Sequence, residues 1–204
     1  SAGWESVMGA SCDLAPWDAA ESDFILLWST NVPATRAHLA PILRQAKAKG
    51  ARVLLIDVYE NPSAALADES ILVRPGSDGA LALSMLQVLD EAGYGDFVRF
   101  DLGLVHQIDY YTGVVFRGYA EGAGAPVLSG GRYDNLGRWT PEETRSITGL
   151  EPETVRALAL AYGRAKAPCI VLGSGFSRSG NGGEATRAIA ALPAAVGAWA
   201  KRGG

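Results

Sequence analysis

Cysteine is scarce in this sequence, and its scarcity argues against several kinds of site. The two cysteines, Cys12 and Cys169, lie far apart, form no Cys-x-x-Cys pair and have no histidine clustered near them. Because most protein metal sites need clustered cysteine, histidine or carboxylate ligands, we predict no metal site. Cys169 lies in an apolar run and is expected to be a small core residue. This usage fits either a reducing compartment, with a cytoplasmic location, or a fragment of a larger protein.

Long hydrophobic runs and excess positive charge are also lacking. No apolar run approaches the roughly 20 residues that a membrane span needs. The chain opens without the basic and apolar regions of a signal peptide. The net charge of -4 argues against a nucleic-acid surface, which is usually basic. We therefore expect no membrane and no nucleic-acid partner, and the 48% hydrophobic content is ample for a packed core.

Strand and helix patterns alternate on both sides of a different middle segment. Short continuous apolar runs, typical of buried parallel strands, occur at 24–28, 53–56, 71–73 and 169–172. Helical patterns cover 37–49, 78–89, 153–165, a stretch opened by a capping-box sequence at Thr140, and a stretch after the glycine-rich loop 173–183. Gly50 is expected to end the first helix and Asp78 to cap the second. These patterns predict an α/β fold in which 24–89 and 139–199 form one open parallel, Rossmann-like sheet flanked by helices.

The middle segment follows a different local pattern. Residues 98–105 alternate like a strand, 110–119 are β-branched and aromatic, and 121–126 are a turn before another strand begins at Val127. These features predict an antiparallel β-meander over 98–136. Because isolated hairpins are marginal in water, it should pack on the rest of the chain or on a second copy in a homodimer. The predicted domains are an α/β domain of 1–89 and 138–204 and an inserted β segment of 90–137.

Polar residues gather where the predicted strands end, which is where open α/β sheets bind their ligands. The candidate binding residues are Ser29, Thr30, Asn31, Asp57, Gly76, Asp78, Gly173 and Arg178. Hydroxyl and backbone N–H groups at such positions suit a phosphate, and a carboxylate suits sugar hydroxyls or a base. The alternative is that Asp78 is only a helix cap and that the glycines only form turns.

Read in order, these strand ends resemble the molybdopterin oxidoreductase family, the group of formate dehydrogenase and dimethyl sulfoxide reductase. The resemblance rests on 28–33, 56–63, 74–83 and the tail 173–204, and it covers roughly 1–88 and 138–204. It implies a domain that holds one molybdopterin guanine dinucleotide. Residues matching Ser29–Asn31, Asp57 and Asp78 would then touch its phosphates, ribose and guanine.

This chain departs from that family pattern at the site itself. Ser29 replaces the usual glycine and is expected to crowd the phosphate loop. Asp57-Val58-Tyr59 replaces the usual Asp-Pro-Arg, so a basic partner is missing. The family's iron–sulfur cysteines, metal-ligating region and C-terminal cofactor domain have no counterpart here. We therefore expect no molybdenum redox chemistry and no bound cofactor.

The middle segment carries its own candidate site. Asp109, Tyr110 and Tyr111 could line a small polar pocket, and Arg132 could bind a carboxylate with two hydrogen bonds. The alternative is that the tyrosines pack in a core and that Arg132 lies on the surface or pairs with Asp134.

This segment is similar to histidyl-tRNA synthetase and, more closely, to the ATP phosphoribosyltransferase regulatory subunit, through 104–113 and 130–134. The resemblance covers about 90–137 and implies a remnant histidine pocket at His106, Asp109, Tyr110, Tyr111 and Arg132. His106 and Gln107 replace the family's Arg-Gly, and because that arginine serves activation chemistry, its loss favours the non-catalytic subunit. His106 itself is a substitution without a role, a satisfied polar residue or a remnant ligand contact.

The two resemblances together indicate a chimera of an oxidoreductase-type domain and a synthetase-like insert. The first hypothesis is a domain with no catalytic residues and at most residual binding of a guanine dinucleotide-type cofactor. The second is a cofactor-binding part of a molybdenum oxidoreductase, and the third is a histidine-biosynthesis regulatory module. We predict no oxidoreductase, aminoacylation or phosphoribosyl-transfer activity from this chain alone.

Overall fold

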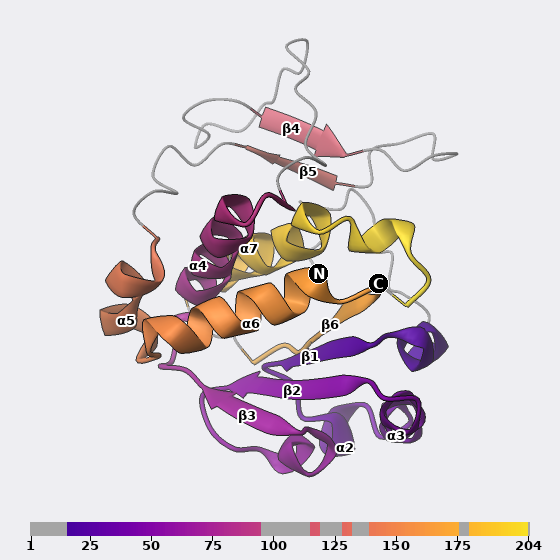
Figure 1. Ribbon diagram of the computed structural model, residues 1–204. Helices are drawn as coiled ribbons and strands as arrows, with labels where there is room; N and C mark the ends of the chain where they lie inside the picture. The colour runs from indigo at the N-terminus through magenta and orange to yellow at the C-terminus, as the bar shows by residue number, and fades with distance from the viewer. Residues whose placement is uncertain (1–15, 95–114, 119–127, 132–138, 176–179, 204) are drawn as a thin grey trace.

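One parallel sheet joins the two halves of the chain. The computed structural model describes residues 16–94, 115–118, 128–131, 139–175 and 180–203 (Figure 1). Strands β1 (Phe24–Trp28), β2 (Arg52–Asp57), β3 (Glu69–Leu72) and β6 (Pro168–Leu172) form a four-stranded sheet in the order β3-β2-β1-β6. Every pair in it is parallel, and central β1 pairs with β2 on one side and β6 on the other. This confirms the predicted α/β fold.

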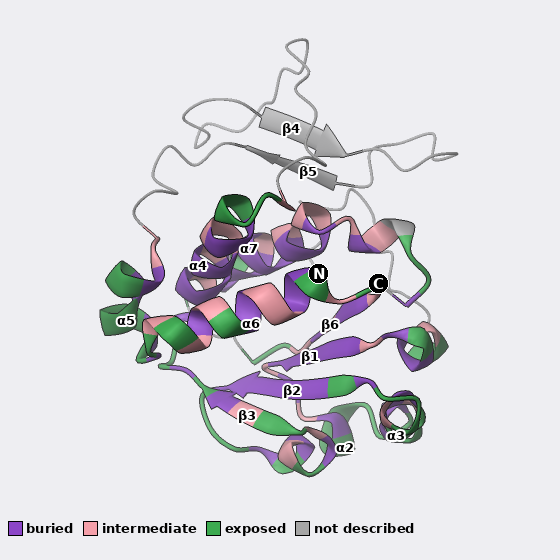
Figure 2. Cartoon of the chain, in the orientation of Figure 1, coloured by how far each residue is buried: buried purple, intermediate pink, exposed green. Residues whose placement is uncertain are grey.

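Helices cover both faces of the sheet. Figure 2 shows the result, because the central strands between these helices are mostly buried. On one face, Leu26 and Trp28 of β1 pack with α4 (Asp78–Glu91), α6 (Pro152–Arg164) and α7 (Gly182–Ala195). On the other face, Ile25 and Leu27 pack toward α3 (Leu39–Ala48). Because both faces are covered, all five residues of β1 are buried, as expected from a continuous apolar run.

Helix ends follow local chemistry, with one correction. Helix α5 (Pro141–Thr148) begins with the predicted capping box, in which Glu143 N–H donates to Thr140 Oγ1 at 3.3 Å. Gly149 ends this helix in the left-handed conformation. Helix α4, however, has Ser77 as its N-cap, so Asp78 is its first residue and not its cap. The reason is that the Asp78 carboxylate is engaged by another part of the fold, as described below.

Four short helices among the described residues were not predicted. They are η1 (Pro16–Glu21), α2 (Val32–Thr35), η2 (Pro62–Leu66) and η6 (Ala198–Ala200). Such segments are too short to show a hydrophobic period. Two of them are set by asparagine instead, because Asn31 caps α2 and Asn61 caps η2 through their side-chain oxygens.

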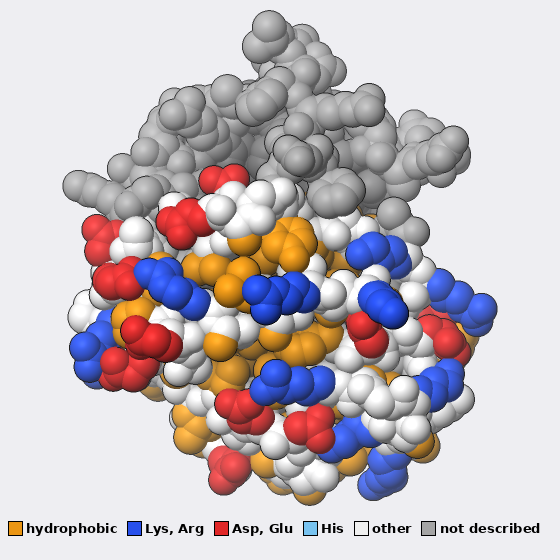
Figure 3. All heavy atoms as spheres, in the orientation of Figure 1, with side chains coloured by type: hydrophobic (Ala, Val, Ile, Leu, Met, Phe, Trp, Pro, Cys, Tyr) orange, Lys and Arg blue, Asp and Glu red, His pale blue; other side chains and the backbone are white. Residues whose placement is uncertain are grey.

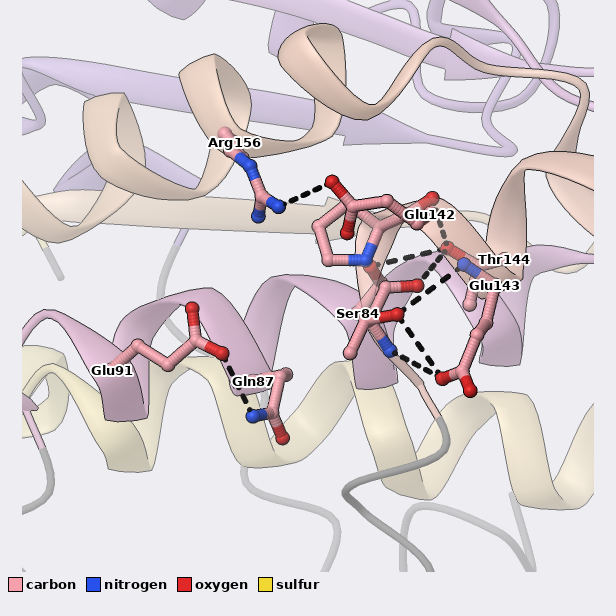
Figure 4. Close-up of polar contacts among 9 residues, drawn as sticks. Ser84, Gln87, Glu91, Glu142, Glu143, Thr144 and Arg156 are labelled. Atoms are coloured by element: carbon pink, nitrogen blue, oxygen red, sulfur yellow. Dashed lines mark hydrogen bonds and ion pairs between the residues drawn. The ribbon is translucent and has the colours of Figure 1, made fainter.

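Contacts between residues far apart in sequence fix the second half of the chain on the first. Arg74, just after β3, donates its backbone N–H to Thr148 O at 3.0 Å, and its guanidinium donates to Ser146 O near the end of α5. Figure 4 shows Ser84 of α4 beside Thr144 of α5, whose hydroxyl donates to Ser84 Oγ at 3.2 Å. These contacts join α5 both to the segment after β3 and to α4.

Strands β4 (Val115–Gly118) and β5 (Leu128–Gly131) form a separate two-stranded antiparallel sheet. These are the described residues of the predicted meander over 98–136, and they give a strand pair rather than a meander. The rest of that segment lies outside the described residues. The domain boundaries at 89 and 138 stay a prediction.

Candidate nucleotide-binding site

The loop after β1 turns sharply and crosses close to the loop after β6. Ser29 has φ 48°, a left-handed conformation that favours glycine, which explains why a family pattern would place glycine here. Gly173 N–H donates to Trp28 O at 2.7 Å. A Cβ atom on Gly173 would lie 1.8 Å from Ser29 O, so only glycine fits at this crossing. The structure thus brings Ser29 and Gly173 together, as the sequence predicted.

A network of side chains holds the loop after β2 against the loop after β1. Asn61 donates its amide to Asp57 Oδ2 at 2.7 Å and to Thr30 O at 3.2 Å. Ser63 Oγ donates to Thr30 O and accepts from Val32 N–H, both at 2.8 Å. Both loops are therefore braced before any ligand binds. Sequence reasoning gave Asn61 and Ser63 no role in the site, although an Asn-Pro-Ser turn four residues after a strand-end aspartate was the signal for it.

Asp57 ends β2 and Asp78 begins α4, and the two carboxylates face different surroundings. Asp57 accepts from Val58 N–H at 2.7 Å as well as from Asn61, and it belongs to the braced loop. Asp78 is 2% exposed and accepts from the Trp28 indole N–H at 2.9 Å and from Ser29 Oγ at 3.3 Å. Asp78 thus positions β1 and its loop from within the core.

The remaining candidates are placed as follows. Asn31 caps α2 by accepting from Ala34 N–H at 3.3 Å, so its side-chain oxygen is already engaged. Gly76 adopts φ 77° in the turn before α4, and the Asn181 amide donates to its carbonyl at 2.7 Å. The Thr30 hydroxyl is buried and has no hydrogen-bond partner among the described residues. Arg178 lies outside the described residues.

The remnant histidine pocket also lies outside the described residues, because His106, Asp109, Tyr110, Tyr111 and Arg132 all fall there. The homodimer contact predicted for this segment stays a prediction for the same reason. Elsewhere, Cys169 is a free, buried thiol, as expected, and burial raises its pKa to about 11. His38 is exposed.

Other parts of the described surface carry fewer features of a binding site than the strand-end loops do. A groove between α6 and the sheet edge is lined by Arg52, Glu69, Glu153 and apolar neighbours, and Figure 3 shows apolar atoms between charged side chains on this face. Within the described ranges, His, Cys, Asp and Glu form no group of three or more that could hold a metal ion. No helix in the described part of the chain is both long and apolar enough to cross a membrane.

Comparison with known proteins gives two kinds of relative. The sequence profile of the family described as histidyl-tRNA synthetase matches residues 7–153. The chain is 31% identical over 204 residues to "Probable oxidoreductase YoaE" of Bacillus subtilis (strain 168), which covers 100% of this chain and 27% of that protein. It is 54% identical over 54 residues to the ATP phosphoribosyltransferase regulatory subunit of Clostridium novyi (strain NT), covering 26% of this chain and 13% of that protein.

A solved structure shares the fold. Acetylene hydratase from Pelobacter acetylenicus superposes with a TM-score of 0.67 at 18% identity, over 96% of this chain and 24% of that one. At this identity the likeness shows the α/β fold alone. The chain spans about a quarter of the length of the hydratase and of YoaE, and less of the regulatory subunit.

Proposed function

The chain belongs to the histidyl-tRNA synthetase family through residues 7–153, and from that premise we propose that it is a ligand-binding module without a complete active site. The ligand that its described part supports best is a nucleotide of the guanine dinucleotide type. Binding would take place at the carboxyl ends of β1, β2 and β6.

The presence of two kinds of relative, which match different lengths of this chain, supports a chimeric origin. YoaE resembles the chain over its whole length at moderate identity, whereas several regulatory subunits resemble it over only 48–54 residues at 48–56% identity. A short, stronger match alongside a long, weaker one is the observation that favours an inserted segment. This supports an α/β domain of 1–89 and 138–204 with an insert at 90–137, and an oxidoreductase-type origin for the α/β part.

The bracing of the strand-end loops is the observation that carries the nucleotide proposal. Three loops meet at Ser29, Asn61 and Gly173 through hydrogen bonds and one close backbone crossing. The N–H groups of Ser29 and Gly173 are bonded within the fold, so a phosphate would be held by other amides of the loop after β1. Asp57 uses two hydrogen bonds of the roughly four that a carboxylate can accept, which leaves capacity for a sugar hydroxyl or a base N–H.

We expect weak affinity for the nucleotide, because this chain departs from the family pattern at the site. A side chain at Ser29 narrows the phosphate loop, and no basic residue follows Asp57. Each lost hydrogen bond to a charged group removes roughly 1.5–3 kcal/mol, so the loss of two or three turns nanomolar affinity into micromolar or weaker.

Calorimetric titration with GDP, ADP and histidine tests the proposal. We expect saturable GDP binding with a dissociation constant in the micromolar range or above. Asp57→Asn should weaken it, whereas Asp90→Asn, an exposed control on α4, should not. The proposal fails if GDP does not bind.

A second candidate is a regulatory role. Relatives titled ATP phosphoribosyltransferase regulatory subunit favour it, because they match at 54% identity over 54 and 50 residues, against 31% for YoaE over the whole chain. In this case the chain would bind histidine and a catalytic ATP phosphoribosyltransferase. Histidine binding without GDP binding in the same titration would favour this role over the first.

A further inference from the structure

An exposed aromatic side chain stands beside the candidate site. Tyr59 is 56% exposed and Val58 is 41% exposed, immediately after the buried Asp57 at the end of β2. The described residues expose five large hydrophobic side chains, and among these only Val58 and Tyr59 are consecutive in the sequence. Their position at the carboxyl end of a central parallel strand is where a ligand of this fold binds.

The loop that carries Tyr59 is held at both ends. Asp57 accepts from Val58 N–H on one side, and Asn61 on the other side ties Asp57 to Thr30 O. Asn61 Oδ1 also accepts from Ser63 N–H at 2.7 Å. Tyr59 therefore lies on a short, braced segment next to the β1 loop, which lowers the entropy cost of using its ring for binding.

The charge of this loop selects which part of a nucleotide it would hold. Residues 57–63 carry Asp57 and Glu60 and no lysine or arginine. Two carboxylates disfavour a phosphate nearby but accept hydrogen bonds from ribose hydroxyls and from base N–H groups. An aromatic ring beside them offers a face on which a base can stack.

We infer that Tyr59 stacks on the purine base of the bound nucleotide, while Asp57 accepts from its ribose or base and the β1 loop holds its phosphates. This inference rests on the proposed nucleotide site and names the half of the ligand that the β2 loop recognises. Tyr59 stands where the family pattern Asp-Pro-Arg has its arginine, and it would hold the nucleotide by stacking instead of by charge.

Saturation-transfer NMR and calorimetry of the full chain with guanosine, GDP and inorganic pyrophosphate test this role. Tyr59→Ala should weaken guanosine and GDP by about 5- to 150-fold, the stacking contribution of roughly 1–3 kcal/mol expressed as a ratio. Tyr59→Phe should stay within about twofold because it keeps the ring. Pyrophosphate binding should not change in either variant. Trp17→Ala, which removes an even more exposed aromatic before the amino end of β1, is the matched control.

The outcomes separate the two proposals. If GDP binds and Tyr59→Ala leaves its affinity unchanged, the stacking role is wrong and the nucleotide site stands. If Tyr59→Phe weakens GDP as much as Tyr59→Ala, the hydroxyl and not the ring is the contact, and stacking is again wrong. If neither guanosine nor GDP binds the unmodified chain, both proposals fall.

Discussion

The two ends of the parallel sheet are built differently. At the amino end, the Asp23 carboxylate accepts from Lys166 and Ala167 N–H, and the Ser22 hydroxyl donates to Gly203 O. A Cβ atom on Gly203 would lie 2.7 Å from the backbone of Glu21, so the chain closes tightly over this end. At the carboxyl end, braced loops leave Ser29 half-buried and Tyr59 exposed. At the amino end the polar groups close the chain over the sheet, whereas at the carboxyl end buried polar groups brace loops on which Ser29 and Tyr59 remain partly accessible.

The strongest test of this contrast is Gly173→Ala at the carboxyl end. Its Cβ atom would meet Ser29 O at 1.8 Å, so the backbone of two loops must shift. We expect a loss of about 3 kcal/mol in the free energy of unfolding, measured by urea denaturation. Gly183→Ala, whose Cβ would meet nothing within 4 Å, is the control and should change stability little. A Gly173→Ala protein of normal stability would contradict the close crossing.

Asp78→Ala should cost about 1–3 kcal/mol, because it leaves the buried Trp28 indole N–H without its acceptor. Asp78→Asn keeps an acceptor oxygen and should cost less. Since Asp78 acts through Trp28, we expect GDP and ADP binding to fall equally in Asp78→Ala. A loss confined to GDP would instead mean that Asp78 contacts guanine, as the family resemblance implies.

Tyr162→Phe probes the core near the amino end. The Tyr162 hydroxyl is fully buried and has no hydrogen-bond partner among the described residues. Removing it should stabilise the protein by about 1 kcal/mol, since an unpaired buried polar group is costly. Thermal unfolding measures the change, and a destabilised variant would show that the hydroxyl has a partner.

Ser29→Gly should have the smallest effect on stability and a visible effect on binding. Glycine relieves a left-handed backbone, worth about 1 kcal/mol, but loses the 3.3 Å contact from Ser29 Oγ to Asp78. It also widens the phosphate loop, so GDP should bind several-fold more tightly in a titration. Weaker GDP binding in this variant would mean that the hydroxyl contacts the ligand.

Much of the sheet could be predicted, because β1, β2 and β6 are short continuous apolar runs. Such a run can be recognised as a buried strand from the local sequence alone. The meeting of Ser29 and Gly173 followed from the rule that parallel strands end at one edge. The inward turn of Asp78 could not be predicted, because its partner Trp28 lies 50 residues away on another element. Asn61 was missed for a related reason: its contact with Thr30 O exists only once the two loops are side by side.

The most direct test of the account is chemical-shift mapping of the labelled chain during GDP titration. We predict saturable shifts of the backbone amides of Ser29, Asn31, Tyr59 and Gly173, and none at Ser22, Asp23 or Gly203. Shifts confined to the amino end, or none at all up to millimolar GDP, would contradict the assignment of the nucleotide site to the carboxyl end of the sheet.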